Sequence, residues 1–451
     1  MPPLSFSFPS RYCLRALALL CFEKTIEMLS NSSTGNSSIF RRRDYVKITI
    51  FGFALTALWQ SMHTVILPLR LLDFVPEAQK NTYLGLLTLT GLLLAMVAQP
   101  IAGAISDHSR FRWGRRRPYI LLGGIVASLL IPGIGSVASY AAIFAVYCLL
   151  QVSTNTAQGP YQAFIPEMAP ERRRGLASGV KGLLEILGGA VLLYLASFLM
   201  GLYSAGAGSQ WLWLVLGILS LVLLGAVVTT VVTVKESPLD GSTPRASLLV
   251  TLRQTFKINI RDNRDFIWFL VSRLLMYMAF TTIQQFALYF LQDVIGVTNP
   301  AEATARFIIL FGGAMLVIVW PAGYLSDRIG RKPVNIIAGI LGAVGIAIIF
   351  FSQDYGTVLC GAGFIGIAMG IFNSTNWALA TDLVTKGEEA RYLAIANMAT
   401  AGGAALARLI GPAIDFFNSQ NSGLGYDVML LACLVYFIAG SALIVKIKRR
   451  G

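Results

Sequence analysis

Amide side chains recur along one stretch of otherwise apolar sequence. Gln151, Asn155, Gln158 and Gln162 are spaced so that a helix places all four on a single face. Amides both donate and accept hydrogen bonds, so they can replace water around the hydroxyl groups of a polar solute. We interpret this stripe as the wall of a cavity; the alternative is that the amides bond one helix to another.

Other polar side chains indicate the same kind of cavity. One helical face holds Gln60 and His63, and His63 can equally be a hydrogen-bonded structural residue. Tryptophan can stack on the ring of a bound solute. Residues in the second half of the chain are predicted to complete the binding site: Arg273, Tyr277, Gln284, Asn373, Asn376, Trp377 and Asn397.

Ionisable residues inside apolar runs are candidates for a coupling ion. Lys181 and Glu185 lie one helical turn apart, and Glu185 is about nine residues, or roughly 13 Å, from the end of its run. A charge at that depth is costly unless it is paired or hydrated. The pair is therefore either structural or a site where a cation binds and leaves. Arg408 is a further candidate for the coupling site, either to bind the substrate or to hold Glu185 ionised. Asp415 is expected only to end a helix.

Long apolar helices must hold these side chains. Hydrophobic residues make up 55% of the 451 residues, charged residues make up 13%, and the mean hydropathy is +0.67. Most of the chain therefore lies in lipid, where a helical span needs roughly 20 apolar residues. Continuous apolar runs disfavour a barrel. The sequence predicts twelve spans, near residues 46–69, 82–105, 118–138, 140–164, 176–203, 210–234, 266–291, 305–326, 333–352, 356–382, 392–416 and 427–446.

Lys and Arg concentrate in alternate loops between these spans. By the positive-inside rule the basic loops and both termini face the cytoplasm. This placement accounts for the net charge of +14 and leaves no continuous basic face for a nucleic acid. The five cysteines show no metal or disulfide spacing, and we predict neither a metal nor a cofactor.

The chain is expected to divide into four parts. Residues 1–44 are predicted to be a disordered cytoplasmic extension, in which Met28 is a possible true start. Residues 45–235 and 265–451 each hold six spans and form two bundles, and residues 236–264 link them in the cytoplasm.

A short charged turn occurs once in each half. QPIAGAISDHSRFRWGRRRP in the first half and WPAGYLSDRIGRKP in the second place Asp107 and Asp327 220 positions apart, which indicates two related halves. Acidic residues also precede arginines after the fourth and tenth spans. Such charges can simply fix orientation, or they can pair in one conformation and separate in another. We predict a cytoplasmic gate, with glycines allowing close helix approach, formed by Gly103, Asp107, Arg115, Arg116, Glu167, Arg173, Gly323, Asp327, Arg331, Asp382 and Arg391.

The charged turns resemble the major facilitator superfamily. Its signature G-x-x-x-D-x-x-G-R-[RK] occurs here as GYLSDRIGRK. The first-half turn and the segment NTAQGPYQAFIPE are similar to the sucrose transporters and to the glycoside, pentoside and hexuronide:cation symporters. The resemblance covers residues 45–450 and implies an all-α fold of two pseudo-symmetric six-helix bundles. Sucrose transporters carry an Asp and an Arg where this chain has Gln151 and Gln162, so neither sucrose specificity nor that route of proton coupling is implied.

We therefore expect a secondary transporter, a lipid-embedded monomer in the plasma or inner membrane. It is predicted to move a small polar solute, a sugar or glycoside first, with H⁺ or Na⁺ as coupling cation. Two alternatives remain: an exporter of amphipathic organic compounds, and a non-transporting member that senses nutrients or delivers pigment. An enzyme is not expected, because no nucleophile elbow, P-loop, dinucleotide loop or metal constellation occurs in the sequence.

Overall fold

The computed structural model describes residues 42–109, 111, 113–234, 236, 264–383 and 389–447. The N-terminal extension up to residue 41, Met28 included, and nearly all of the predicted linker lie outside the described residues. Arg43–Gly451 forms one compact unit. Every regular element in the described part of the chain is a helix.

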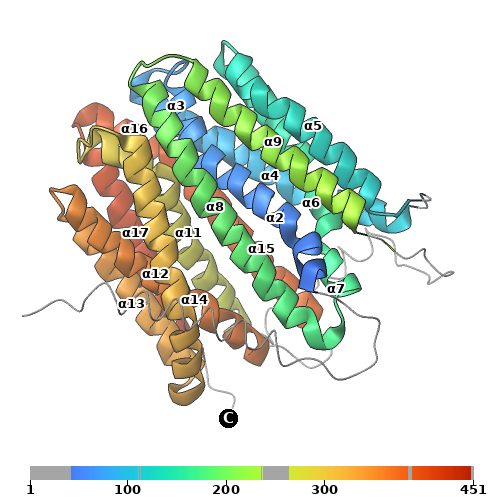
Figure 1. Cartoon of the computed structure of the whole chain (residues 1–451). Coiled ribbons are helices and arrows are strands. Elements are labelled where there is room, and N and C mark those ends of the chain that lie inside the picture. Colours follow the sequence, from blue (N-terminus) through green and yellow to red (C-terminus); the bar gives the residue numbers. More distant parts are fainter. Residues whose placement is uncertain are drawn as a thin grey trace, which may run out of the picture. The chain divides into compact units, whose positions relative to one another are not determined.

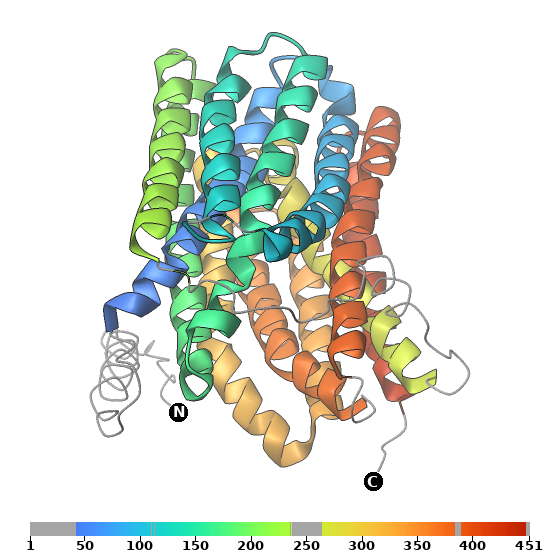
Figure 2. The same ribbon diagram turned by 90° about the vertical axis from the view of Figure 1, so that its right-hand side faces the viewer.

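Long helices run alongside one another through this unit (Figures 1 and 2). Those of the first half are α2 (Arg42–Ser61), α4 (Lys80–His108), α5 (Arg117–Ser136), α6 (Tyr140–Gln162), α8 (Arg174–Ser204) and α9 (Gln210–Thr233). Those of the second half are α11 (Arg264–Asp293), α12 (Pro300–Ile329), α13 (Arg331–Phe350), α14 (Tyr355–Leu383), α15 (Glu389–Ala407), α16 (Gly411–Gln420) and α17 (Leu424–Val445). Shorter elements are η1 (Met62–Ile66), α3 (Leu67–Leu71), η2 (Glu77–Gln79), α7 (Phe164–Met168), η3 (Glu171–Arg173) and η4 (Arg408–Ile410).

Eleven helical stretches of the described chain are long and apolar enough to cross a membrane. The remaining predicted span, residues 140–164, is α6, whose amides make it less apolar than the others. Together they match the twelve predicted spans, so the expected all-α architecture of twelve membrane helices is confirmed.

Two of the spans change helix type partway along their length. The first joins α2 to α3 through the π turn η1, and the eleventh joins α15 to α16 through the 3₁₀ turn η4. A proline follows each turn, Pro68 in the first span and Pro412 in the eleventh. Proline has no N–H, so the regular helical hydrogen-bond pattern is interrupted at both positions. The first turn carries His63, and the second begins with Arg408.

Helices of each half pack against one another, and a smaller set of contacts joins the halves. α6 contacts α4 and α5, while α14 contacts α12 and α13. A Cβ atom on Gly159 of α6 would overlap the carbonyl oxygen of Gln99 on α4, so glycine allows this close approach. Between the halves, α8 lies beside α12 (Figure 1), α4 contacts η4 and α16, and η1 contacts α11.

Candidate functional site

A cavity of about 250 Å³ lies where the two halves of the chain meet, and we call it the central cavity. Its wall comes from α2, η1, α6 and α8 of the first half and from α11 and η4 of the second. Leu55, Trp59 and Tyr161 contribute large, mainly apolar side chains to its lining. Its polar lining consists of Thr56, Gln60, His63, Thr64, Gln158, Gln162, Lys181, Glu185, Thr281, Gln284, Gln285 and Arg408.

Many residues singled out from the sequence meet at this cavity. From the predicted binding set these are Gln60, His63, Gln158, Gln162 and Gln284. All three candidates for the coupling ion also line this cavity, Lys181 and Glu185 from α8 and Arg408 from η4. Gln285 also lines the cavity and was not predicted, although it directly follows Gln284 and carries the same amide.

The other half of the amide stripe lies behind the wall. Gln151 and Asn155 are buried and do not line the cavity. The Asn155 amide donates to Oε1 of Gln151 (3.2 Å), and the Gln151 amide donates to the Tyr147 hydroxyl (2.8 Å). That hydroxyl is 2.9 Å from Nε2 of His63. A chain of hydrogen bonds therefore runs from the buried amides to His63 on the cavity wall, through Tyr147, which the sequence did not single out.

Most of the second-half residues form a separate buried cluster. Arg273 is only 1% exposed; its Nε donates to the Thr400 hydroxyl (2.8 Å), and another guanidinium nitrogen bonds Asn376. The Trp377 ring lies 4.5 Å from this guanidinium. In the same region the Tyr277 hydroxyl donates to Asn373 (2.7 Å), and Asn397 is exposed on α15. None of the residues named in this paragraph lines the central cavity.

Glu185 is held close to the first span. Its carboxylate lies 3.7 Å from the Lys181 ammonium. A Cβ atom on Gly52 of α2 would come within 2.8 Å of both the Glu185 carboxylate and the Tyr161 hydroxyl, so the missing side chain makes room for them. Tyr161 in turn accepts the Gly52 N–H and donates to the Thr49 carbonyl, both at 3.1 Å.

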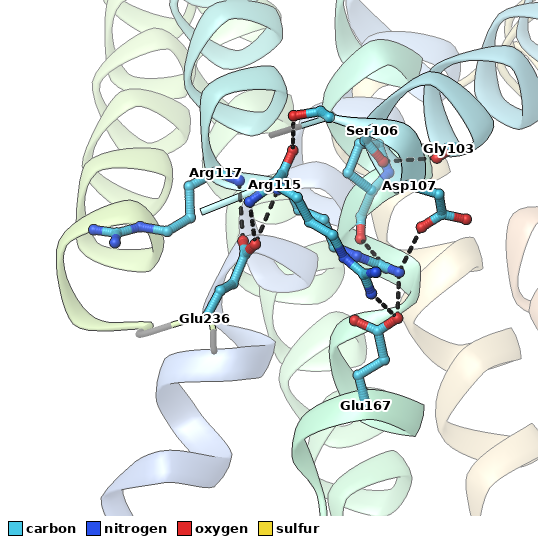
Figure 3. Close-up of polar contacts among 10 residues, drawn as sticks. Gly103, Ser106, Asp107, Arg115, Arg117, Glu167 and Glu236 are labelled. Atoms are coloured by element: carbon cyan, nitrogen blue, oxygen red, sulfur yellow. Dashed lines mark hydrogen bonds and ion pairs between the residues drawn. The ribbon is translucent and has the colours of Figure 1, made fainter. Parts of the chain in front are cut away.

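Charged residues gather at one end of the helices, which we call the basic end because it carries Arg115–Arg117 (Figure 3). The Arg116 guanidinium bonds Asp107 (2.8 Å), Glu167 and the Pro160 carbonyl (3.0 Å), and Arg115 also pairs with Glu167. Burial lowers the pKa of Arg116, and the Glu167 and Asp107 carboxylates oppose that shift. Four predicted gate residues of the first half therefore pair here, while Gly103 lies on the same stretch of α4 and Arg173 lies in η3.

Glu236 completes this cluster and was not predicted. Its carboxylate accepts the backbone N–H groups of Arg115 (2.7 Å), Arg116 (3.0 Å) and Arg117 (3.0 Å), where α5 begins (Figure 3). A carboxylate at this position satisfies the free amides of a helix start. The only signal in the sequence was a lone acid directly after the sixth span.

The second half has a smaller cluster at its corresponding turn. Arg331 pairs with Asp382 (2.6 Å) and bonds the Ala378 carbonyl. Asp327 is exposed and has no ion pair within the described residues, and the Arg391 side chain lies outside them. Gly323 faces the Ser374 hydroxyl of α14. Within the described chain, each ion pair among the predicted gate residues joins residues of the same half.

At the opposite end, polar bonds cross between the halves. Lys80, where α4 begins, pairs with Asp293 at the end of α11 (2.7 Å). Asp415 of α16, only 7% exposed, accepts the Asn81 amide (2.9 Å) and the backbone N–H of Thr82 (2.6 Å). The expectation that Asp415 merely ends a helix is therefore wrong, because its carboxylate bonds the start of α4. Charged residues are sparse in the predicted loops at this end of the helices, and that scarcity could have indicated that Lys80 and Asp293 have a specific role.

Comparisons with known proteins agree with this architecture. The sequence matches the model of the MFS/sugar transport protein family over residues 52–446. It is similar to the minor myo-inositol transporter IolF of Bacillus subtilis (strain 168), at 25% identity over 26% of this chain and 26% of that protein. It is also similar to the sucrose transport protein SUT1 of Oryza sativa subsp. japonica, at 33% identity over 20% of this chain and 21% of that protein. The matched segments thus span about a quarter or less of these relatives.

A solved structure shares the fold over most of the chain. It is a bacterial homolog of the human lysosomal transporter Spinster in an inward-facing and occupied conformation. The TM-score is 0.68 at 16% identity, and the match covers 91% of this chain and 97% of that one.

Proposed function

The chain belongs to the MFS/sugar transport protein family, and from this premise we propose that it carries a small polyhydroxylated solute, a sugar or glycoside, by alternating access. Family membership makes the protein a multi-pass integral membrane transporter and not an enzyme, and it confirms the resemblance to the major facilitator superfamily and the sucrose transporters. One observation carries the proposal: five glutamine amides line a cavity to which both halves contribute. Amides at such a position suit hydroxyl groups, which need both donors and acceptors.

The distribution of polar bonds supports a cavity that opens toward the basic end. Bonds between the halves involve Lys80, Asp293 and Asp415 at the opposite end, whereas the ion pairs seen at the basic end among the described residues stay within each half. Following the positive-inside rule, we propose that the basic end faces the cytoplasm and that the protein lies in the plasma or inner membrane. On this proposal the described conformation is inward-facing, and the basic-end clusters are the cytoplasmic gate.

Counterflow in proteoliposomes tests the proposed transport. Vesicles containing the full chain are loaded with an unlabelled sugar or polyol, starting with myo-inositol and sucrose, and uptake of the labelled compound is followed. Gln158→Leu removes one cavity amide and should weaken apparent affinity by about 5- to 30-fold, the effect of one or two lost hydrogen bonds. Gln353→Leu, at an exposed loop position, is the matched control and should leave uptake unchanged.

The competing functions give different results in the same vesicles. Flux of amphipathic compounds without flux of any sugar would favour an exporter. Saturable sugar binding without counterflow would favour a sensor, and either result would overturn the proposal.

Coupling to H⁺ or Na⁺ forms a second part of the proposal and rests on Glu185. Its carboxylate is a cavity-lining acid with a cation only one helical turn away. Glu185→Gln keeps the shape but removes the charge, so it should abolish accumulation against a gradient while sparing exchange at equal concentrations. Unchanged accumulation in this variant would remove Glu185 from the coupling mechanism.

A further inference from the structure

Arg408 is a buried cation on the wall of the central cavity. The residue is only 8% exposed and begins the 3₁₀ turn of the eleventh span. A Cβ atom on Gly85 of α4 would overlap the Arg408 carbonyl oxygen, so the two backbones are in close contact across the halves. This contact holds the Arg408 backbone beside α4, and the side chain lines the cavity.

Within the described part of the chain, the Arg408 guanidinium has no ion-pair partner. One of its nitrogens donates to the Ala404 carbonyl, while Nε has no hydrogen-bond partner within the described chain. Glu185 is the acidic residue of the cavity lining, and it pairs with Lys181. The lining therefore carries two cations and one anion. A buried charge without a partner costs free energy, and an anionic ligand would offset that cost.

Arg273 shows how the same half of the protein accommodates a structural arginine. It is also buried, but its guanidinium bonds the Thr400 hydroxyl and the Asn376 amide and lies against the Trp377 ring. These partners satisfy the group without a ligand. Arg408 has no comparable set within the described residues, although it lines the cavity and Arg273 does not.

A second unsatisfied donor lies on the same wall. Nε2 of Gln285 is buried without a hydrogen-bond partner in the described chain, and the residue is 6% exposed. Gln285 and Arg408 both come from the second half, whereas Gln60, Gln158 and Gln162 line the cavity from the first. The second-half wall thus offers a cation and a free N–H to an acceptor, and the first-half wall offers amides to hydroxyl groups.

We infer that the transported solute carries a carboxylate, which Arg408 and Gln285 bind, and that it belongs to the polyhydroxylated monocarboxylates, the sugar acids. A carboxylate offers two acceptor oxygens and one negative charge, and a guanidinium binds it with paired hydrogen bonds. The inference rests on the proposed sugar transport and narrows its substrate class.

Matched pairs of neutral and acidic solutes test the inference. Binding to the purified full chain and counterflow in proteoliposomes are measured for glucose and glucuronate, galactose and galacturonate, and sorbitol and gluconate. The acid of at least one pair should bind about 10- to 100-fold more tightly than its neutral counterpart, the range of one charge-assisted hydrogen-bonded pair. Arg408→Gln should remove this preference while leaving binding of the neutral member measurable.

Two further variants separate recognition from misfolding. Gln285→Leu leaves every charge in place and should weaken acid binding more than neutral binding. Arg306→Gln changes an exposed arginine at the start of α12 and should change neither.

The outcomes distinguish this inference from the proposed function. Neutral sugars that bind and exchange at least as well as their acids would overturn the inference and leave sugar transport standing. Neutral-sugar transport that depends on chloride, with the dependence lost in Arg408→Gln, would assign Arg408 to an inorganic anion and also overturn it. Binding of neither class would overturn both.

Discussion

Asp415 should control which side of the transporter is closed. Its carboxylate accepts hydrogen bonds from the Asn81 amide and from the Thr82 backbone N–H, and so ties α16 to the start of α4. Asp415→Asn keeps the size of the side chain, but it removes the charge and turns an NH₂ group toward at least one of the three donors, the third being the backbone N–H of Asn81 (3.3 Å). Hydrogen bonds to a charged group contribute about 1.5–3 kcal/mol each, so we expect a loss of about 3 kcal/mol.

On the proposal that this end is closed in the described conformation, that loss should act on the conformational equilibrium, because separating the halves here would break the hydrogen bonds of Asp415. A change of about 3 kcal/mol shifts the ratio of closed to open opposite ends by about 100-fold toward open. The shift can be measured as a distance distribution between two spin labels in a cysteine-free background. Ala78→Cys in η2 and Ser419→Cys in α16 place the labels at exposed positions on either side of the bonds. The variant should gain a population at longer distance.

A control at the same end separates this effect from a general loss of charge. Asp73 pairs with Arg70 (2.6 Å) and accepts the Tyr203 hydroxyl, all within the first half. Asp73→Asn should leave the distance distribution unchanged. If Asp415→Asn gave the same distribution as the parent protein, the bonds between the halves would not hold this end closed, and our reasoning would be refuted.

Three further predictions concern single contacts. Glu236→Gln removes a carboxylate that caps three amides at the start of α5 and should cost about 1 kcal/mol, seen as a lower unfolding temperature in detergent; an unchanged temperature would contradict the capping role. Gly159→Ala introduces a methyl group into the carbonyl of α4 and should destabilise the protein by about 1–3 kcal/mol, whereas Gly217→Ala, which meets open space, should not; equal effects of the two would refute the packing argument. Tyr147→Phe breaks the hydrogen-bond chain to His63 and should weaken solute affinity by about fivefold in counterflow, and unaltered affinity would show that this chain does not position His63.

The number and order of spans were predictable because lipid imposes a simple requirement. A helix that crosses a membrane needs a continuous apolar run, and each of the twelve predicted runs has its helix. The π turn and the 3₁₀ turn were not predicted. Pro68 and Pro412 are visible in the sequence, but proline is accommodated in membrane helices in several ways, so its presence does not fix the local helix type.

Helical periodicity predicts which residues share one face of a helix, but it does not predict which of them reach the cavity. It correctly grouped Gln151, Asn155, Gln158 and Gln162 on one side of α6, yet only the last two reach the cavity. How far a cavity extends along a helix depends on the neighbouring helices, which a single sequence does not describe.

Hydrogen-bond and ion-pair partners that are distant in the sequence could not be predicted for the same reason. The charge of Arg273 was recognised, but its bonds to Thr400 and Asn376 were not, and without them a structural arginine resembles a binding residue. Likewise, Lys80 and Asp293 are 213 residues apart, and only the fold brings them together.

The hydrogen bonds between the start of α4 and Asp415 restrict which substitutions can shift this protein between its two orientations. Two of the three donors are the peptide nitrogens of Asn81 and Thr82, which every amino acid except proline supplies. Substitutions that change the side chains at the start of α4 therefore leave the backbone hydrogen bonds to Asp415 intact. Substitutions that favour one orientation of the transporter over the other are therefore expected in α16, the ten-residue helix that carries the acceptor Asp415.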